Sequence, residues 1–111
     1  MTRITRFVGM DAHKDTISIA VAKEGRDPAE ALGTRPNDGR RLLKRLDKLG
    51  PREQLLCCYE AGPTGYGLHR YLRFAGIRCD VVAPSLVPDL HGDRVKTDKS
   101  DSAKLAHYLR S

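Results

Sequence analysis

The chain has 111 residues, of which 40% are hydrophobic, so it is long enough for one domain around a single apolar core. Twenty Lys and Arg residues against fourteen Asp and Glu residues give a net charge of +6, which favours a polyanionic partner such as nucleic acid. No apolar run approaches the ~20 residues of a membrane span, and the three cysteines form neither a disulfide framework nor a Cys-x-x-Cys motif, so we expect a cytoplasmic protein with reduced thiols and no membrane partner.

The first predicted elements are strands. Residues 4–11 carry apolar side chains around Gly9 and end on the carboxylate of Asp11, which is typical of a central strand. Residues 16–22 alternate with a period of two, which predicts a half-buried strand. A polar bend separates these segments, so we expect an antiparallel hairpin, followed by a short third strand over residues 29–34.

A helix is predicted after the third strand. Asn37 or Asp38 can cap it, four leucines follow an i, i+1, i+4, i+7 spacing, and Gly50 and Pro51 end it. A basic face results on the other side, made of Arg40, Arg41, Lys44, Arg45 and Lys48. Such a face is most often only solvated, and contact with a phosphate backbone is the alternative.

The next apolar run also ends on a carboxylate. Residues 55–60 form it, Glu60 is its last residue, and the chain breaks at Gly62 and Pro63. This pattern predicts a buried strand that carries Glu60 to its C-terminal end, where open α/β sheets hold their sites. A carboxylate there needs a metal, a cation or water, because burying an unpaired one costs several kcal/mol.

A helix over residues 64–75 and a strand over residues 77–82 follow, and a closing helix spans residues 98–110. We expect the middle helix to turn inward Leu68, Tyr71, Leu72 and Ala75. The complete order resembles an RNase H-like α/β domain, with a mixed sheet whose first strands are antiparallel and whose later strands are parallel, flanked by helices. In that connectivity the first strand and the strand of Glu60 lie side by side and in parallel.

Four carboxylates are therefore expected to converge. Asp11 and Glu60 would end neighbouring strands, and the i, i+3 spacing of Asp98 and Asp101 puts both on one face of the closing helix. Hard oxygen ligands of this kind select Mg²⁺ or Mn²⁺ for phosphoryl transfer. The spacing alone is equally compatible with Asp98 favouring a helix N-terminus and Asp101 being solvated. Among the histidines, only His13 is considered for this site.

Three motifs occur in order along the chain: Val-Gly-Met-Asp-Ala-His-Lys at residues 8–14, Tyr-Glu-Ala-Gly-Pro-Thr-Gly-Tyr-Gly-Leu at residues 59–68, and Arg-Val-Lys-Thr-Asp-Lys-Ser-Asp at residues 94–101. Together they resemble the N-terminal domain of the DEDD transposases of bacterial insertion sequences, which is similar to the RuvC Holliday-junction resolvase. The resemblance implies an enzyme of DNA transposition and recombination that acts on DNA phosphodiesters. The catalytic metal ligands it implies are Asp11, Glu60, Asp98 and Asp101.

The resemblance also implies partners and a longer protein. Members of that family bind insertion-sequence ends, target DNA and a structured guide RNA, and they assemble as homo-oligomers with composite active sites. They continue into a second domain that supplies a nucleophilic serine. We therefore expect residues 1–111 to be a RuvC-like domain, excised or truncated, that does not carry out strand exchange alone.

Seven basic residues are the candidate nucleic-acid contacts. Cations beside the paired aspartates would offset the repulsion between carboxylates and an approaching phosphate, and the basic helix and the first bend add further cations. The set is Lys14, Arg40, Arg41, Lys44, Arg94, Lys96 and Lys99.

Two other functions fit part of the sequence. The first is a non-catalytic nucleic-acid-binding remnant of a transposase, whose basic faces work without metal. The second is half of a sugar-kinase-like or actin-like ATPase. The ATPase needs a glycine-rich phosphate hairpin, and residues 11–15 supply no glycine.

Overall fold

A computed structural model describes residues 3–62, 66–83 and 98–111, and of residues 98–101 it describes only the backbone. In chain order the elements are β1 (Arg6–Ala12), β2 (Thr16–Lys23), β3 (Glu30–Pro36), α1 (Gly39–Asp47), the 3-10 turn η1 (Arg52–Gln54), β4 (Leu55–Glu60), α2 (Gly67–Phe74), β5 (Arg78–Val82) and α3 (Asp98–Arg110).

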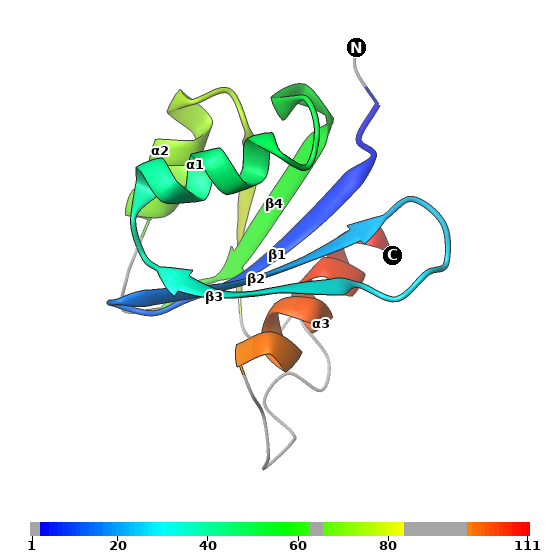
Figure 1. The fold of residues 1–111 in the computed structure, drawn as a ribbon, viewed down its shortest axis with the longest axis horizontal. Coiled ribbons are helices and arrows are strands. Elements are labelled where there is room, and N and C mark those ends of the chain that lie inside the picture. The colour runs from blue at the N-terminus through cyan, green and yellow to red at the C-terminus, as the bar shows by residue number, and fades with distance from the viewer. Residues whose placement is uncertain (1–2, 63–65, 84–97) are drawn as a thin grey trace.

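The five strands form one mixed sheet in the order β3-β2-β1-β4-β5. The β1–β2 and β2–β3 pairs are antiparallel, whereas the β1–β4 and β4–β5 pairs are parallel. Helices α1 and α2 cover one face of this sheet and α3 covers the other (Figure 1). The expected mixed sheet and its element order are confirmed. None of the described helices is both long and apolar enough to cross a membrane.

Each face of the sheet has its own apolar core, because successive side chains of a strand point to opposite faces. The larger core lies under α1 and α2 and is centred on Val8, Met10, Ile17, Ile19, Leu42, Leu46, Tyr59 and Leu72. The smaller core lies under α3 and consists of Cys58, Val82 and Leu105, with Tyr108 and Leu109 packed against it. The sheet is therefore covered on both sides.

Strand β2 is buried on both faces, so the expectation of a half-buried strand is wrong. Its six residues from Ile17 to Ala22 are all buried, including Ser18 at 0% exposure. The period-two pattern is real, but its second face consists of small side chains, Ser18, Ala20 and Ala22, over which α3 packs. Small residues let a helix approach closely, and here they do not indicate solvent.

Helix α1 begins as expected. Asp38 caps it, and its Oδ1 accepts hydrogen bonds from the backbone N–H groups of Arg40 (2.9 Å) and Arg41 (3.2 Å). The helix ends at Asp47, earlier than predicted, and Gly50 follows in the turn with a φ of +144°, a conformation that favours glycine.

Helix α2 begins at Gly67, later than the predicted residue 64, and residues 63–65 lie outside the described part of the chain. Leu72 is buried as expected, but Tyr71 is 39% exposed, so the expectation for Tyr71 is wrong. The Tyr71 ring lies against Gly39 at the start of α1, where a Cβ atom on Gly39 would be 2.7 Å from it. Tyr71 therefore joins the two helices at the rim of the core.

Helix α3 runs antiparallel to β1. Ser102 and Ala106 pack on Gly9 in the middle of β1, and the Arg110 Nη1 donates to the carbonyl oxygen of Lys23 (3.0 Å). Lys23 pairs with Arg6 at the start of β1. The first turn of α3 consequently lies toward the C-terminal end of β1.

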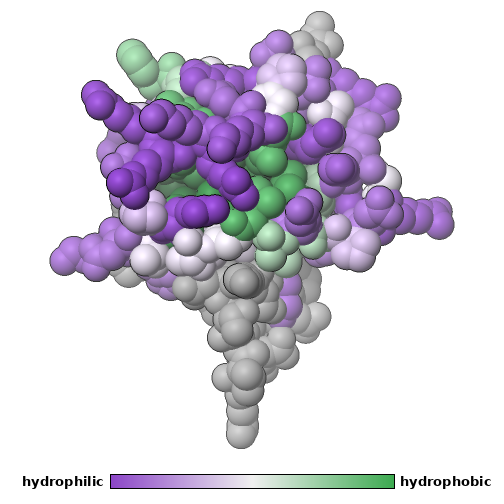
Figure 2. All heavy atoms as spheres, viewed as in Figure 1, coloured by the Kyte–Doolittle hydropathy of each residue, from purple (hydrophilic) through white to green (hydrophobic). Residues whose placement is uncertain are grey.

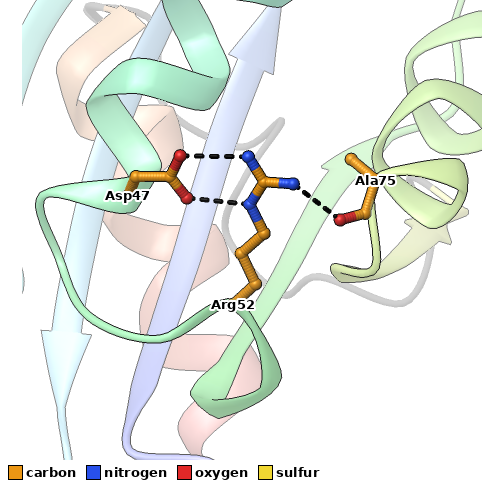
Figure 3. Close-up of polar contacts among 3 residues, drawn as sticks. All are labelled: Asp47, Arg52 and Ala75. Carbon is orange, nitrogen blue, oxygen red and sulfur yellow. Dashed lines mark hydrogen bonds and ion pairs between the residues drawn. The ribbon is translucent and has the colours of Figure 1, made fainter.

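A bidentate ion pair ties the ends of α1 and α2 together. Arg52 donates from Nε and Nη2 to the two carboxylate oxygens of Asp47, at 2.9 and 3.0 Å, and from Nη1 to the Ala75 carbonyl at 2.9 Å (Figure 3). The hydrogen bonds from Arg52 lower the pKa of Asp47. The connection between α1 and β4 is thereby anchored to the end of α2.

The three cysteines are core residues, as expected. Cys57 and Cys58 lie in β4, and Cys79 lies opposite Cys57 on β5. Burial raises the pKa of all three thiols, to about 12 for Cys79. They are therefore protonated at neutral pH and suited to packing.

Candidate active site

The sheet brings Asp11 and Glu60 to equivalent positions on adjacent strands. The last paired residues of β1 and β4 are Met10 and Tyr59, and each acid follows directly. Because paired strands lie about 4.8 Å apart, the two acids are close neighbours at the C-terminal edge of the parallel pair. Both parts of the expectation, the parallel pairing and the shared edge, agree with the structure.

Both acids belong to the face covered by α3. Gly9, two residues before Asp11, is in contact with α3, and Cys58, two residues before Glu60, packs against Leu105 of that helix. Alternation along a strand puts residues two apart on the same face. The carboxylates are thus directed to the side of the sheet on which α3 lies.

The backbone of α3 places positions 98 and 101 near that edge. Both are in the first turn of the helix, at the end that lies toward the C-terminus of β1. Helical spacing puts them in the same row as Ser102 and Leu105, which pack on the sheet. The side chains of positions 98 and 101 lie outside the described atoms, so the convergence of all four acids remains a prediction.

His13 lies beside Asp11. Its Nε2 is 3.3 Å from the Asp11 Oδ2, and the Asp11 side chain is only 19% exposed. The backbone of His13 is held by hydrogen bonds from its N–H to the Thr16 carbonyl (2.8 Å) and from Asn37 Nδ2 to its own carbonyl (2.7 Å). When protonated, His13 can partly neutralise Asp11.

A row of hydroxyls continues from Asp11 across the sheet, and the sequence did not reveal it. Asp11 pairs with Ser18, which pairs with Thr34, and the two hydroxyl oxygens are 2.7 Å apart. The signal was the small polar side chain at position 18 of an otherwise apolar strand. Ser18 meets its hydrogen-bonding need with Thr34, so the row supports the sheet beneath α3.

The described residues supply two carboxylates for a metal and not a complete site. No group of three or more His, Cys, Asp or Glu side chains in residues 3–62, 66–83 and 102–111 could hold an ion. Asp11 and Glu60 offer hard oxygen donors from two rigid strands, which fit Mg²⁺ or Mn²⁺. Further ligands would have to come from outside these residues, and the first turn of α3 is the adjacent element.

The candidate nucleic-acid contacts occupy several surfaces. Lys14 is exposed in the bend between β1 and β2, and hydrophilic side chains gather over α1 (Figure 2), where Arg40, Arg41 and Lys44 are found. Lys99 lies in the first turn of α3, with its side chain outside the described atoms. Two further candidates lie outside the described residues, Arg94 and Lys96.

Comparison with curated proteins identifies transposases as relatives. The chain is 42% identical over 108 residues to the transposase for insertion sequence element IS1533 of Leptospira borgpetersenii, covering 95% of this chain and 31% of that protein. It is 45% identical over 109 residues to the "Putative transposase y4qE" of Sinorhizobium fredii, covering 95% of this chain and 27% of that protein. The chain thus spans less than a third of the length of either relative. No protein-family model matches it.

Comparison with solved structures concerns the fold. RuvC of Thermus thermophilus superposes with a TM-score of 0.63 at 14% identity, over 93% of this chain and 91% of RuvC. The large terminase of a thermophilic bacteriophage superposes with a TM-score of 0.51 at 12% identity, over 99% of this chain and 28% of the terminase. The chain is therefore homologous to part of bacterial transposases and has a RuvC-like, RNase H-like fold, which confirms the transposase resemblance and the fold expected from the sequence.

Proposed function

We propose that this chain is the metal-dependent catalytic domain of a transposase, a recombinase that acts on DNA phosphodiesters during transposition of an insertion sequence. The observation that carries the proposal is the placement of Asp11 and Glu60 directly after the paired residues Met10 and Tyr59. Homology to transposases over 95% of the chain supports DNA as the substrate.

In this proposal the metal ligands are Asp11, Glu60, Asp98 and Asp101. Bound Mg²⁺ or Mn²⁺ would supply Lewis-acid activation of the attacking and leaving oxygens of phosphoryl transfer. Asp11 and Glu60 provide fixed oxygen donors, since both belong to a sheet that is covered on two sides. Helix α3, which packs on Gly9, would carry Asp98 and Asp101 to this site.

Further partners belong to the same proposal. Lys14, Arg94, Lys96 and Lys99 would contact substrate phosphates near the acids, where cations offset the repulsion from carboxylates. The longer protein would act as a homo-oligomer in the cytoplasm on insertion-sequence ends and target DNA, with a structured guide RNA. Residues 1–111 would be its RuvC-like domain.

Titration of the 111-residue chain with Mn²⁺, followed by calorimetry, tests the metal site. We expect Asp11→Asn and Glu60→Gln each to weaken Mn²⁺ binding at least about tenfold, because each removes a direct ligand. Asp27→Asn is the matched control, since Asp27 is exposed in the turn between β2 and β3 and carries the same charge. Unchanged Mn²⁺ affinity in both site variants would sink the proposal.

The principal alternative is a nucleic-acid-binding module without catalysis. Such a module binds nucleic acid equally well with a chelator present and shows no carboxylate-dependent Mn²⁺ binding. In a full-length transposase that contains this domain, Glu60→Ala would then leave recombination undiminished. Loss of recombination with the domain still folded favours the catalytic role.

A further inference from the structure

We propose that a basic groove between β3 and α1 binds the phosphate backbone of a nucleic-acid duplex, at a site separate from the acids. The groove has a volume of about 320 Å³ and is lined by Arg35, Pro36, Arg41, Lys44, Arg45 and Lys48. Hydrophilic side chains gather over α1 on this side of the molecule (Figure 2). The inference deepens the proposed function, on which it rests for the class of partner.

The positive charge of the basic groove is not compensated. Among the described residues, none of the five cationic side chains forms an ion pair or a hydrogen bond. The two acids nearest in sequence to the cations of α1 are already engaged, because Asp38 caps α1 and Asp47 is held by Arg52. Like charges three and four residues apart on a helix are destabilising, and a bound polyanion would remove that repulsion.

The helix dipole accounts for only part of this arrangement. Cations in the last turn of a helix are favourable, which covers Lys44, Arg45 and Lys48. Arg41 lies in the first turn, where the dipole favours an anion, and Arg35 lies on β3. The dipole of α1 therefore explains neither Arg41 nor Arg35, and both line the same groove.

Arg45 lines the groove and carries a donor without a partner. Its Nε is buried and has no hydrogen-bond partner among the described residues. Arg45 also lines the groove, so its guanidinium charge attracts an anion that enters the groove from outside. Phosphate groups are anions of this kind, and arginine binds them well because its donors form a planar fork.

The spacing of the cations suits a phosphate backbone. Arg41, Lys44, Arg45 and Lys48 are at i, i+3, i+4 and i+7, and this span rises about 10 Å at 1.5 Å per residue. One strand of a B-form duplex carries about three phosphates over that length. A contact with roughly three phosphates is therefore expected.

The groove and the acids lie on opposite faces of the sheet. Leu42 and Leu46 of α1 pack on the same face as Met10, whereas Asp11 belongs to the α3 face. Along the sheet, Ala12 pairs with Ile17, which pairs with Arg35, so β3 is two strands away from β1. The segment of nucleic acid bound in the groove is consequently different from the segment whose phosphodiester lies at the acids.

Fluorescence anisotropy with a 20-base-pair DNA duplex, and separately with an RNA duplex of the same sequence, tests the groove. Titrations of the 111-residue chain from 50 to 200 mM KCl with a chelator present remove any contribution of metal. The groove variant replaces Arg41, Lys44 and Lys48 by Gln. The control variant replaces Lys23, Arg26 and Arg78 by Gln, three exposed cations elsewhere on the surface that give the same change of net charge.

We expect the groove variant to bind the tighter of the two duplexes at least about tenfold more weakly, with a slope of log K against log salt shallower by about 2–3. The control variant should change little. Equal losses in the two variants, or no loss in the groove variant, would overturn the proposal.

Lysine acetylation of the unmutated chain provides a second measurement that does not depend on how the variants fold. Bound duplex should protect Lys44 and Lys48 and leave Lys23 reactive; equal reactivity of all three overturns the proposal. Because the duplex titrations are made in chelator and the Mn²⁺ titrations are made without duplex, failure of the metal site and failure of the groove are distinguishable.

Discussion

Gly9 of β1 lies directly beneath the backbone of Ala106 of α3: a Cβ atom on Gly9 would stand 2.5 Å from the Ala106 amide nitrogen and 2.8 Å from the Leu105 Cβ. We predict that Gly9→Ala lowers the free energy of unfolding by about 1–3 kcal/mol or more, because neither the strand nor the helix backbone can yield. Urea unfolding measures this change. The variant should also weaken Mn²⁺ binding, since displacement of α3 moves Asp98 and Asp101.

Gly67→Ala is the matched control for that prediction. Gly67 opens α2, and no atom lies within 4 Å of a Cβ placed there. Alanine is a better helix former than glycine, so stability should stay the same or rise slightly. Equal stability of Gly9→Ala and the unmutated chain would contradict the packing of α3 on β1.

Removal of one acid should not weaken the domain when metal is absent. Asp11 and Glu60 end adjacent strands, and two nearby carboxylates repel each other. We predict that Glu60→Gln, in a chelator, unfolds at the same or a higher urea concentration than the unmutated chain. Added Mn²⁺ should stabilise the unmutated chain more than Glu60→Gln, by mass action on the folded state. A markedly less stable Glu60→Gln in chelator would indicate a structural role for Glu60.

Most of the fold could be predicted from local patterns. Strand β4 has the predicted bounds, Asp38 caps α1, and the closing helix spans the predicted residues. The errors lie where tertiary contacts decide burial. The period-two pattern of β2 predicts a solvent face for its small side chains. Helix α3, about eighty residues later in the chain, covers them instead.

Alkaline pH should destabilise the domain through its thiols. Burial raises the pKa of Cys57, Cys58 and Cys79, whereas an unfolded thiol ionises near pH 8.5. The contribution of the buried thiols to the free energy of unfolding is therefore fully present below about pH 8.5. It is lost as the pH rises toward the folded pKa values, because the unfolded state releases the protons first. The loss amounts to up to about 1.4 kcal/mol per pH unit for each thiol. Urea unfolding at pH 8 and pH 10, in reductant, measures it.

Cys79→Ala provides the comparison for the alkaline loss. The substitution lowers stability at every pH by removing buried sulfur, but the slope of stability between pH 8.5 and 10 should become shallower. An unchanged slope would mean that groups other than Cys79 cause the alkaline loss.

Within the Asp47–Arg52 pair, we expect Arg52 to contribute more to stability than Asp47. Arg52→Ala removes the hydrogen bonds to both Asp47 and the Ala75 carbonyl, whereas Asp47→Asn leaves the bond to Ala75 in place. We predict a lower urea midpoint for Arg52→Ala than for Asp47→Asn. The Asp47 pKa is lowered, so the contribution of the pair is present above about pH 4 and is lost as pH falls through the folded pKa. An Asp47→Asn protein that loses as much stability as Arg52→Ala would contradict this order.

Predicting the candidate site needed the register of β1 against β4 as well as the motifs. The sequence placed Asp11 and Glu60 at strand ends, but only pairing could make them neighbours. The contact between His13 and Asp11 depends on how the bend between β1 and β2 closes, and no local pattern encodes that. Likewise, the basic groove needs Arg35 of β3 opposite α1, which a helical wheel of α1 alone does not contain.

The order in which the chain is synthesised adds a consequence to the contact between α3 and β1. At typical translation speeds of 5–20 residues per second, α3 follows the last strand, β5, by on the order of a few seconds. During that interval Gly9, Cys58 and Val82 belong to an apolar sheet face that the described elements made earlier do not cover. We therefore expect chaperones to bind that face of the nascent domain. The carboxylates of Asp11 and Glu60 come together before α3 is made.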